Sequence, residues 1–108
     1  MLDIKRIRHD VDGVKADLAR KGVDLDEVDA VVAADARQRE LATERDDLRR
    51  RVKDLSAEVG ALHRDGRADE AEAARAESRR LGDEQTAVAE QADRAAEEVR
   101  DLLLRIPN

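Results

Sequence analysis

Apolar residues recur along two stretches of this chain at alternating intervals of three and four residues, with charged residues between them. The first stretch runs from Val31 to Leu62 and the second from Ala71 to Leu102. Such intervals place the apolar residues on one stripe of an α-helix, so the pattern predicts two long amphipathic helices. The segment from His63 to Arg67 between them is short and polar, and it contains Gly66. These features are typical of the turn in a helical hairpin.

The two stripes mirror each other about this turn. In an antiparallel coiled coil, the residue numbers of facing positions add to one constant along the whole seam. Here they add to 133 in ten consecutive layers: Leu62 with Ala71, Val59 with Ala74, Leu55 with Ser78, Val52 with Leu81, Leu48 with Gln85, Arg45 with Val88, Leu41 with Ala92, Gln38 with Ala95, Ala34 with Val99 and Val31 with Leu102. We therefore predict an all-α fold that is dominated by a long antiparallel two-helix coiled-coil hairpin. Each long helix should reach about 55 Å.

Shorter elements precede the hairpin. The first eight residues fit either a short strand or a helical turn. Asp10 is a suitable cap for a helix from about Val11 to Lys21, which Gly22 would end in a left-handed conformation. Asp24 followed by Glu27 forms a capping-box pattern at the start of the first long helix. We expect the short helix to pack at the base of the hairpin, around Val28, Val32, Val99, Leu103 and Ile106.

Composition agrees with long solvated helices and narrows the possible functions. The 108 residues include no Phe, Tyr, Trp or Cys, and 44% of them are charged. Disorder is the competing explanation for so polar a chain, but the sustained heptads argue against it. No apolar run approaches the roughly 20 residues of a membrane span, so we expect no membrane partner. The absence of cysteine is compatible with a cytoplasmic location.

Catalytic and metal sites are not expected in this chain. A two-helix hairpin has no interior in which paired carboxylates would be shielded, and no glycine-rich phosphate loop is present. The two histidines, His9 and His63, are far apart in the sequence and lack a clustered set of further ligands, so we predict no metal and no cofactor. The net charge of −6 speaks against non-specific nucleic-acid binding and leaves no reason to expect DNA as a partner.

Basic residues nevertheless gather in one band of the predicted hairpin. The first long helix carries Arg49, Arg50, Arg51 and Lys53, and the sum of 133 places Arg79 and Arg80 opposite positions 54 and 53, with Arg75 nearer the tip. Guanidinium groups outside the seam could pair with phosphates. The alternative is that these cations only solvate the helices and pair with neighbouring carboxylates. Arg64 and Arg67 offer a second basic group at the tip.

The chain opens with MLDIKRIR, followed by Val14, Lys15, Leu18, Lys21 and Gly22, and it closes with LLLRIPN. These two ends resemble the N-terminal domain of bacterial seryl-tRNA synthetases. Between these ends, that family carries a coiled-coil arm of about this length. The early helix of the family often begins with an Asn-Pro-Glu-like sequence, whereas this chain has Asp10, Val11 and Asp12. That departure affects the capping detail and leaves the assignment intact.

The resemblance implies a division of the chain and a function. Residues 1–25 would form the base segment with its short helix, 26–64 and 69–105 the two arm helices, 65–68 the tip turn, and 106–108 the start of a linker to a catalytic domain outside this chain. In this family the arm grips the long variable arm and elbow of serine tRNA and directs the acceptor end to the catalytic site. The resemblance also implies a homodimeric parent enzyme that uses ATP and Mg. We therefore predict tRNA contacts at Arg49, Arg50, Lys53, Arg75, Arg79 and Arg80, with Arg64 and Arg67 at the tip.

Two other functions remain open from the sequence. A structural or protein-interaction coiled coil would share the hairpin but would leave both end motifs unexplained. A synthetase-like paralogue would carry the same arm without aminoacylation activity. Class II synthetase motifs downstream of Asn108 in the gene would distinguish the enzyme from the paralogue.

Overall fold

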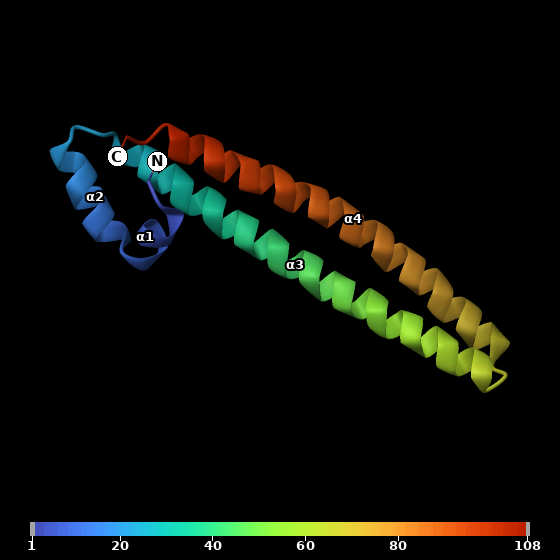
Figure 1. Ribbon diagram of the computed structural model, residues 1–108. Helices are drawn as coiled ribbons and strands as arrows, with labels where there is room; N and C mark the ends of the chain where they lie inside the picture. Colours follow the sequence, from blue (N-terminus) through green and yellow to red (C-terminus); the bar gives the residue numbers. More distant parts are fainter. Residues whose placement is uncertain (1, 108) are drawn as a thin grey trace. The chain divides into compact units, whose positions relative to one another are not determined.

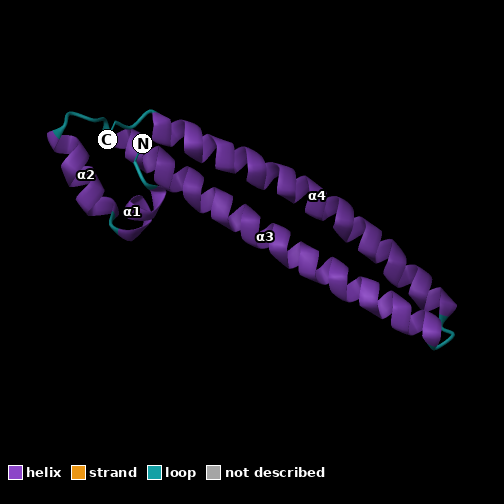
Figure 2. Cartoon of the chain, viewed as in Figure 1, coloured by secondary structure: helices purple, strands orange, loops and turns teal. Residues whose placement is uncertain are grey.

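The computed structural model describes residues 2–107, and these residues form four α-helices and no strand. The helices are α1 (Ile4–His9), α2 (Val11–Arg20), α3 (Leu25–Arg64) and α4 (Ala68–Leu104) (Figures 1 and 2). They are arranged in two compact units, which we call the base (residues 2–39 and 93–107) and the arm (residues 40–92). The two long helices contribute to both units.

The arm is an antiparallel pair formed by the second part of α3 and the first part of α4 (Figure 1). Every seam position that the heptads predict between residues 41 and 92 is buried or half-buried, and Leu48 and Leu81 are 5% and 1% exposed. The positions between the seam residues are mostly exposed. The predicted all-α hairpin is thus confirmed, and its seam is the one that the spacing of apolar residues indicates.

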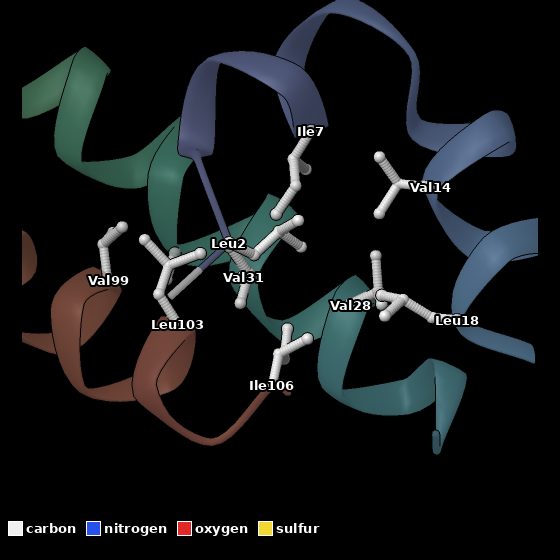
Figure 3. Close-up of a cluster of buried hydrophobic side chains, with 10 residues drawn as sticks. Leu2, Ile7, Val14, Leu18, Val28, Val31, Val99, Leu103 and Ile106 are labelled. Atoms are coloured by element: carbon white, nitrogen blue, oxygen red, sulfur yellow. The ribbon is translucent and has the colours of Figure 1, made fainter. Parts of the chain in front are cut away.

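The base has a core of its own, to which all four helices contribute (Figure 3). Ile7 of α1, Val14 of α2 and Val28 of α3 all belong to this core, and each of these residues is 1% exposed or less. The core continues through other buried residues: Leu2, Leu18, Val31, Ala34, Val99, Leu103 and Ile106. The expected packing of the short helix around Val28, Val99, Leu103 and Ile106 is therefore confirmed, with Val32 half-buried beside them.

Two glycines end helices in the same way. Gly22 after α2 and Gly66 after α3 have φ of 78° and 73°, a left-handed conformation that residues with a Cβ rarely adopt. The next N–H in each case reaches back to a carbonyl in the last turn, from Val23 to Leu18 at 3.0 Å and from Arg67 to Leu62 at 2.9 Å. This is the Schellman arrangement, and it satisfies carbonyls that the helix end leaves without a partner. The glycine at the tip thereby lets α3 stop and the chain turn back.

The structure resolves or corrects several local expectations. The opening segment is helical, and the carboxylate of Asp3 caps it by accepting a hydrogen bond from the N–H of Lys5 at 2.9 Å. Asp10 caps α2 through the N–H of Gly13 at 3.0 Å, as predicted. The capping box at α3 is wrong in detail, because Asp24 accepts from the N–H of Asp26 rather than from that of Glu27. The carboxylate of an aspartate before a helix can accept from the N–H of either the second or the third helical residue, and here it accepts from the second.

Candidate nucleic-acid interface

All eight predicted contact residues lie in the arm and are exposed. Arg49, Arg50, Lys53 and Arg64 belong to α3, Arg75, Arg79 and Arg80 belong to α4, and Arg67 lies in the tip turn. Their backbone positions are fixed because the seam residues beside them are held between the helices. The long side chains extend from this scaffold into solvent, where they are accessible to a polyanion.

Five of these cations are held by carboxylates close to them in the sequence. Arg67 pairs with Glu70, and Arg50 lies 3.5 Å from Asp47. Glu72 serves two arginines, with its carboxylate oxygens 3.3 Å from Arg75 and 3.7 Å from Arg79. Arg80 has the most carboxylate contacts of the five. Glu77 accepts two hydrogen bonds from it at 3.0 and 2.5 Å, and Glu84 lies 3.7 Å away. The sequence left open that the basic residues only pair with neighbouring carboxylates. Such pairing is present at these five of the eight predicted contact residues.

The remaining three cations have no such partner. Within residues 2–107, Arg49, Lys53 and Arg64 take part in no side-chain hydrogen bond and no ion pair. A cation without a carboxylate partner can bind a phosphate without first breaking an ion pair within the protein. These residues are therefore the most available cations among the predicted contacts.

The contact of Arg80 with Glu77 perturbs both groups. The hydrogen bond from Arg80 lowers the pKa of Glu77, and the nearby charge of Arg51 lowers it further. The same hydrogen bond, with Glu77 as the acceptor, raises the pKa of Arg80. The side chains of Arg80 and Glu77 are 62% and 41% accessible to solvent, so water and salt screen this pair and its contribution to stability is small. Its consequence is that Arg80 is already occupied before any ligand arrives.

His63, near the end of α3, contacts one of the predicted cations. Nε2 of His63 lies 2.9 Å from the guanidinium of Arg75, so this contact links α3 to α4. Because a guanidinium only donates, the nitrogen of His63 is the acceptor in this contact. The sequence indicates that these two residues lie on the same side of the hairpin, since His63 and Arg75 each directly follow a seam residue. Long exposed side chains have several possible partners, however, and spacing alone does not choose among them.

The same structure offers little to a metal or a small molecule. No group of three or more His, Cys, Asp or Glu within the described part of the chain is placed to hold a metal ion. In the base, an open hollow of about 160 Å³ is lined by Ile7, Arg8, Val11, Val32, Asp35, Ala36 and Arg39. Two of these residues, Arg8 and Asp35, pair with each other within it. None of the helices in residues 2–107 has the length and apolarity that a membrane span requires.

Comparison with known proteins identifies the family. The model of one protein family, described as the seryl-tRNA synthetase N-terminal domain, matches residues 1–108. The chain belongs to this family. It is similar to the serine–tRNA ligase of Thermotoga neapolitana, with 39% identity over 108 residues that cover 100% of this chain and 25% of the relative. The serine–tRNA ligases of Paraburkholderia phymatum and Burkholderia mallei are 39% and 38% identical over the same 108 residues, which cover 24% of each relative.

The chain thus spans about a quarter of the length of these curated relatives. No solved structure matches it significantly. The family match covers the base and the arm alike, so both end motifs and the coiled coil are explained by one assignment. The resemblance noted from the two ends of the sequence is confirmed. Among the described residues, the cations that the sequence predicts as tRNA contacts all lie in the arm.

Proposed function

We propose that this chain is the tRNA-binding domain of a serine–tRNA ligase, whose arm binds the long variable arm and elbow of serine tRNA. The observation that carries this proposal is the match of the seryl-tRNA synthetase N-terminal domain family to the whole chain. The domain would direct the acceptor end of the tRNA to a catalytic domain that follows residues 106–108. That catalytic domain would bind ATP and Mg and would form the homodimer.

The chemistry of the arm suits a ligand that is read by its shape. Double-stranded RNA hides its base edges in a deep and narrow major groove, so proteins recognise its phosphates, its 2′-hydroxyl groups and its geometry. The arm offers exposed arginines on two helices whose backbone is fixed by a buried seam. It offers no aromatic side chain on which an unpaired base could stack. These features favour backbone contacts to a duplex such as the stem of a long variable arm.

Five of the eight predicted contact residues are proposed with that role. Arg49, Lys53 and Arg64 would bind phosphates directly, and Arg75 and Arg79 would exchange a shared carboxylate for a phosphate. Each such contact releases counterions from the RNA, so the dissociation constant should rise steeply with salt concentration. An acidic chain, with a net charge of −6, otherwise has little affinity for RNA.

Binding of two matched RNAs tests this function. Fluorescence anisotropy would measure the affinity of the chain for serine tRNA and for the same tRNA with its long variable arm cut to a short loop. We expect the shortened tRNA to bind at least about tenfold more weakly, because the loss of two or more phosphate contacts has an effect of that size. Equal affinity for both tRNAs, or no measurable binding of either at low salt, would contradict the proposal.

A further inference from the structure

The register of the arm gives it two chemically different sides. In a helix with a seam, the residue that follows each seam residue lies on one side of the stripe, and the residue that precedes it lies on the other. In an antiparallel pair, the residues that follow seam residues lie on the same side of both helices, which we call the following side. The residues that precede seam residues lie together on the other side, the preceding side. The following side comprises positions 42, 46, 49, 53, 56, 60 and 63 of α3 and 72, 75, 79, 82, 86 and 89 of α4. The preceding side comprises positions 40, 44, 47, 51, 54, 58 and 61 of α3 and 70, 73, 77, 80, 84, 87 and 91 of α4.

Two interactions between the helices agree with this division. His63 and Arg75, which are 2.9 Å apart, both follow seam residues. Arg51 and Glu77, whose charges act on each other, both precede seam residues. The residue numbers of these pairs add to 138 and 128, which lie five above and five below the 133 of the seam layers. That symmetric offset is what the two flanks of an antiparallel coiled coil require.

Charge is distributed unequally between the two sides. The following side carries four cations and two carboxylates, which are Arg49, Lys53, Arg75 and Arg79 with Asp46 and Glu72. The preceding side carries two cations and eight carboxylates, which are Arg51 and Arg80 with Glu40, Glu44, Asp47, Asp54, Glu58, Glu70, Glu77 and Glu84. We call them the basic side and the acidic side. The net charge of the arm therefore conceals one side that attracts a polyanion and one that repels it.

Pairing strengthens the contrast. Arg49 and Lys53 on the basic side have no carboxylate partner among the described residues, and Arg75 and Arg79 share Glu72. On the acidic side, Arg80 is held by Glu77 and Glu84, and the charge of Arg51 acts on the same Glu77. The remaining positions of the basic side also leave room around its cations, since they are mostly small: Ala42, Ser56, Gly60, Gly82, Thr86 and Ala89. A broad sugar–phosphate backbone could approach the helices closely there.

We propose that, of these two sides, the arm binds duplex RNA through the basic side, with Arg49, Lys53, Arg75 and Arg79 on phosphates, while the acidic side faces away from the RNA. This inference rests on the proposed function and adds the orientation of the arm to it. It separates two adjacent residues of the predicted band, because Arg79 would contact RNA and Arg80 would not. The acidic side would also disfavour a duplex docked in the opposite orientation.

Adjacent arginines provide matched variants for the test. R79Q and R80Q remove the same charge from neighbouring exposed positions of α4, and R49Q and R51Q do so from exposed positions two residues apart on α3. The affinity of each variant for serine tRNA would be measured by anisotropy at several salt concentrations. We expect R79Q and R49Q to weaken binding about five- to tenfold and to reduce the salt slope by about one unit each. R80Q and R51Q should change the affinity less than about twofold, because loss of long-range attraction is screened.

Each outcome bears on one claim. Equal losses in R79Q and R80Q, or larger losses in R80Q and R51Q, would overturn the assignment of the basic side while the tRNA-binding function stands. No loss in any of the four variants would also overturn it, since RNA would then be bound through other residues. If the parent chain itself does not bind serine tRNA, the proposed function fails. Helical circular dichroism of all four variants should match the parent, because these positions lie outside the seam.

Discussion

A single buried carboxylate fixes part of the base at the scale of residues. The side chain of Asp35 on α3 is 6% exposed, and Arg8 of α1 donates two hydrogen bonds to it at 2.7 and 2.6 Å. This two-point contact raises the pKa of Arg8, with the hydrogen bond as the main cause. The pair ties the six-residue α1 to α3. Sequence alone did not reveal it, because an aspartate among alanines on a charged helix is typical of a solvated position.

Breaking this pair from either end should have unequal effects. R8M leaves the buried carboxylate without a partner, and we expect it to lower the free energy of unfolding by about 2–3 kcal/mol. D35N leaves Arg8 partly exposed and able to hydrate, so a loss of about 1 kcal/mol is expected. Urea unfolding followed by circular dichroism measures both values.

The pair of Lys15 with Asp29, at 2.5 Å, supplies the control, because the carboxylate of Asp29 is 58% exposed. D29N should change stability far less than either variant of the buried pair, because solvent screens an exposed ion pair. If R8M proved no more destabilising than D29N, the contact between Arg8 and Asp35 would not hold α1 in place.

At the scale of elements, the heptad spacing predicted more than the local signals did. Ten layers, mostly of apolar residues but with Gln38, Arg45 and Gln85 among them, specify both long helices and their seam, and the buried or half-buried state of these positions confirms them. Gly22 and Gly66 end their helices as expected, since only a residue without a Cβ adopts a positive φ easily. The opening segment could not be assigned, because six residues hold too little periodicity to distinguish a helix from a strand. The division of the chain at residues 25, 64, 68 and 105 stays a prediction.

The register can be tested with paired cysteines, because the chain has none of its own. Val52 and Leu81 face each other in one predicted layer, so V52C with L81C should form a disulfide within one chain under mild oxidation. Val88 lies seven residues further along α4, about 10 Å away, so V52C with V88C should not. Non-reducing electrophoresis after proteolysis at the tip would separate the two results. A disulfide in the second pair and none in the first would show a different register.

At the scale of the whole molecule, charge matters by its position and not by its sum. Eight contact residues were predicted from the sequence, and the structure places them all on the exposed surface of the arm. Spacing could not show which of them are occupied by carboxylates, because that depends on the conformations of flexible side chains. Arg80 and Arg79 are adjacent in the sequence, yet one is held by two glutamates and the other shares one. The proposed contact with the variable arm depends on this difference.

Cleavage of serine tRNA by an iron chelate tethered to the arm tests the central claim most directly. A chelate attached through S56C would lie on the basic side, and one attached through E58C, two residues away, on the acidic side. Both variants should bind the tRNA with nearly the parent affinity. We predict strong hydroxyl-radical cleavage in the long variable arm from position 56 and weak cleavage from position 58. Cleavage outside the variable arm, or equal cleavage from both positions in a complex that still forms, would contradict this arrangement.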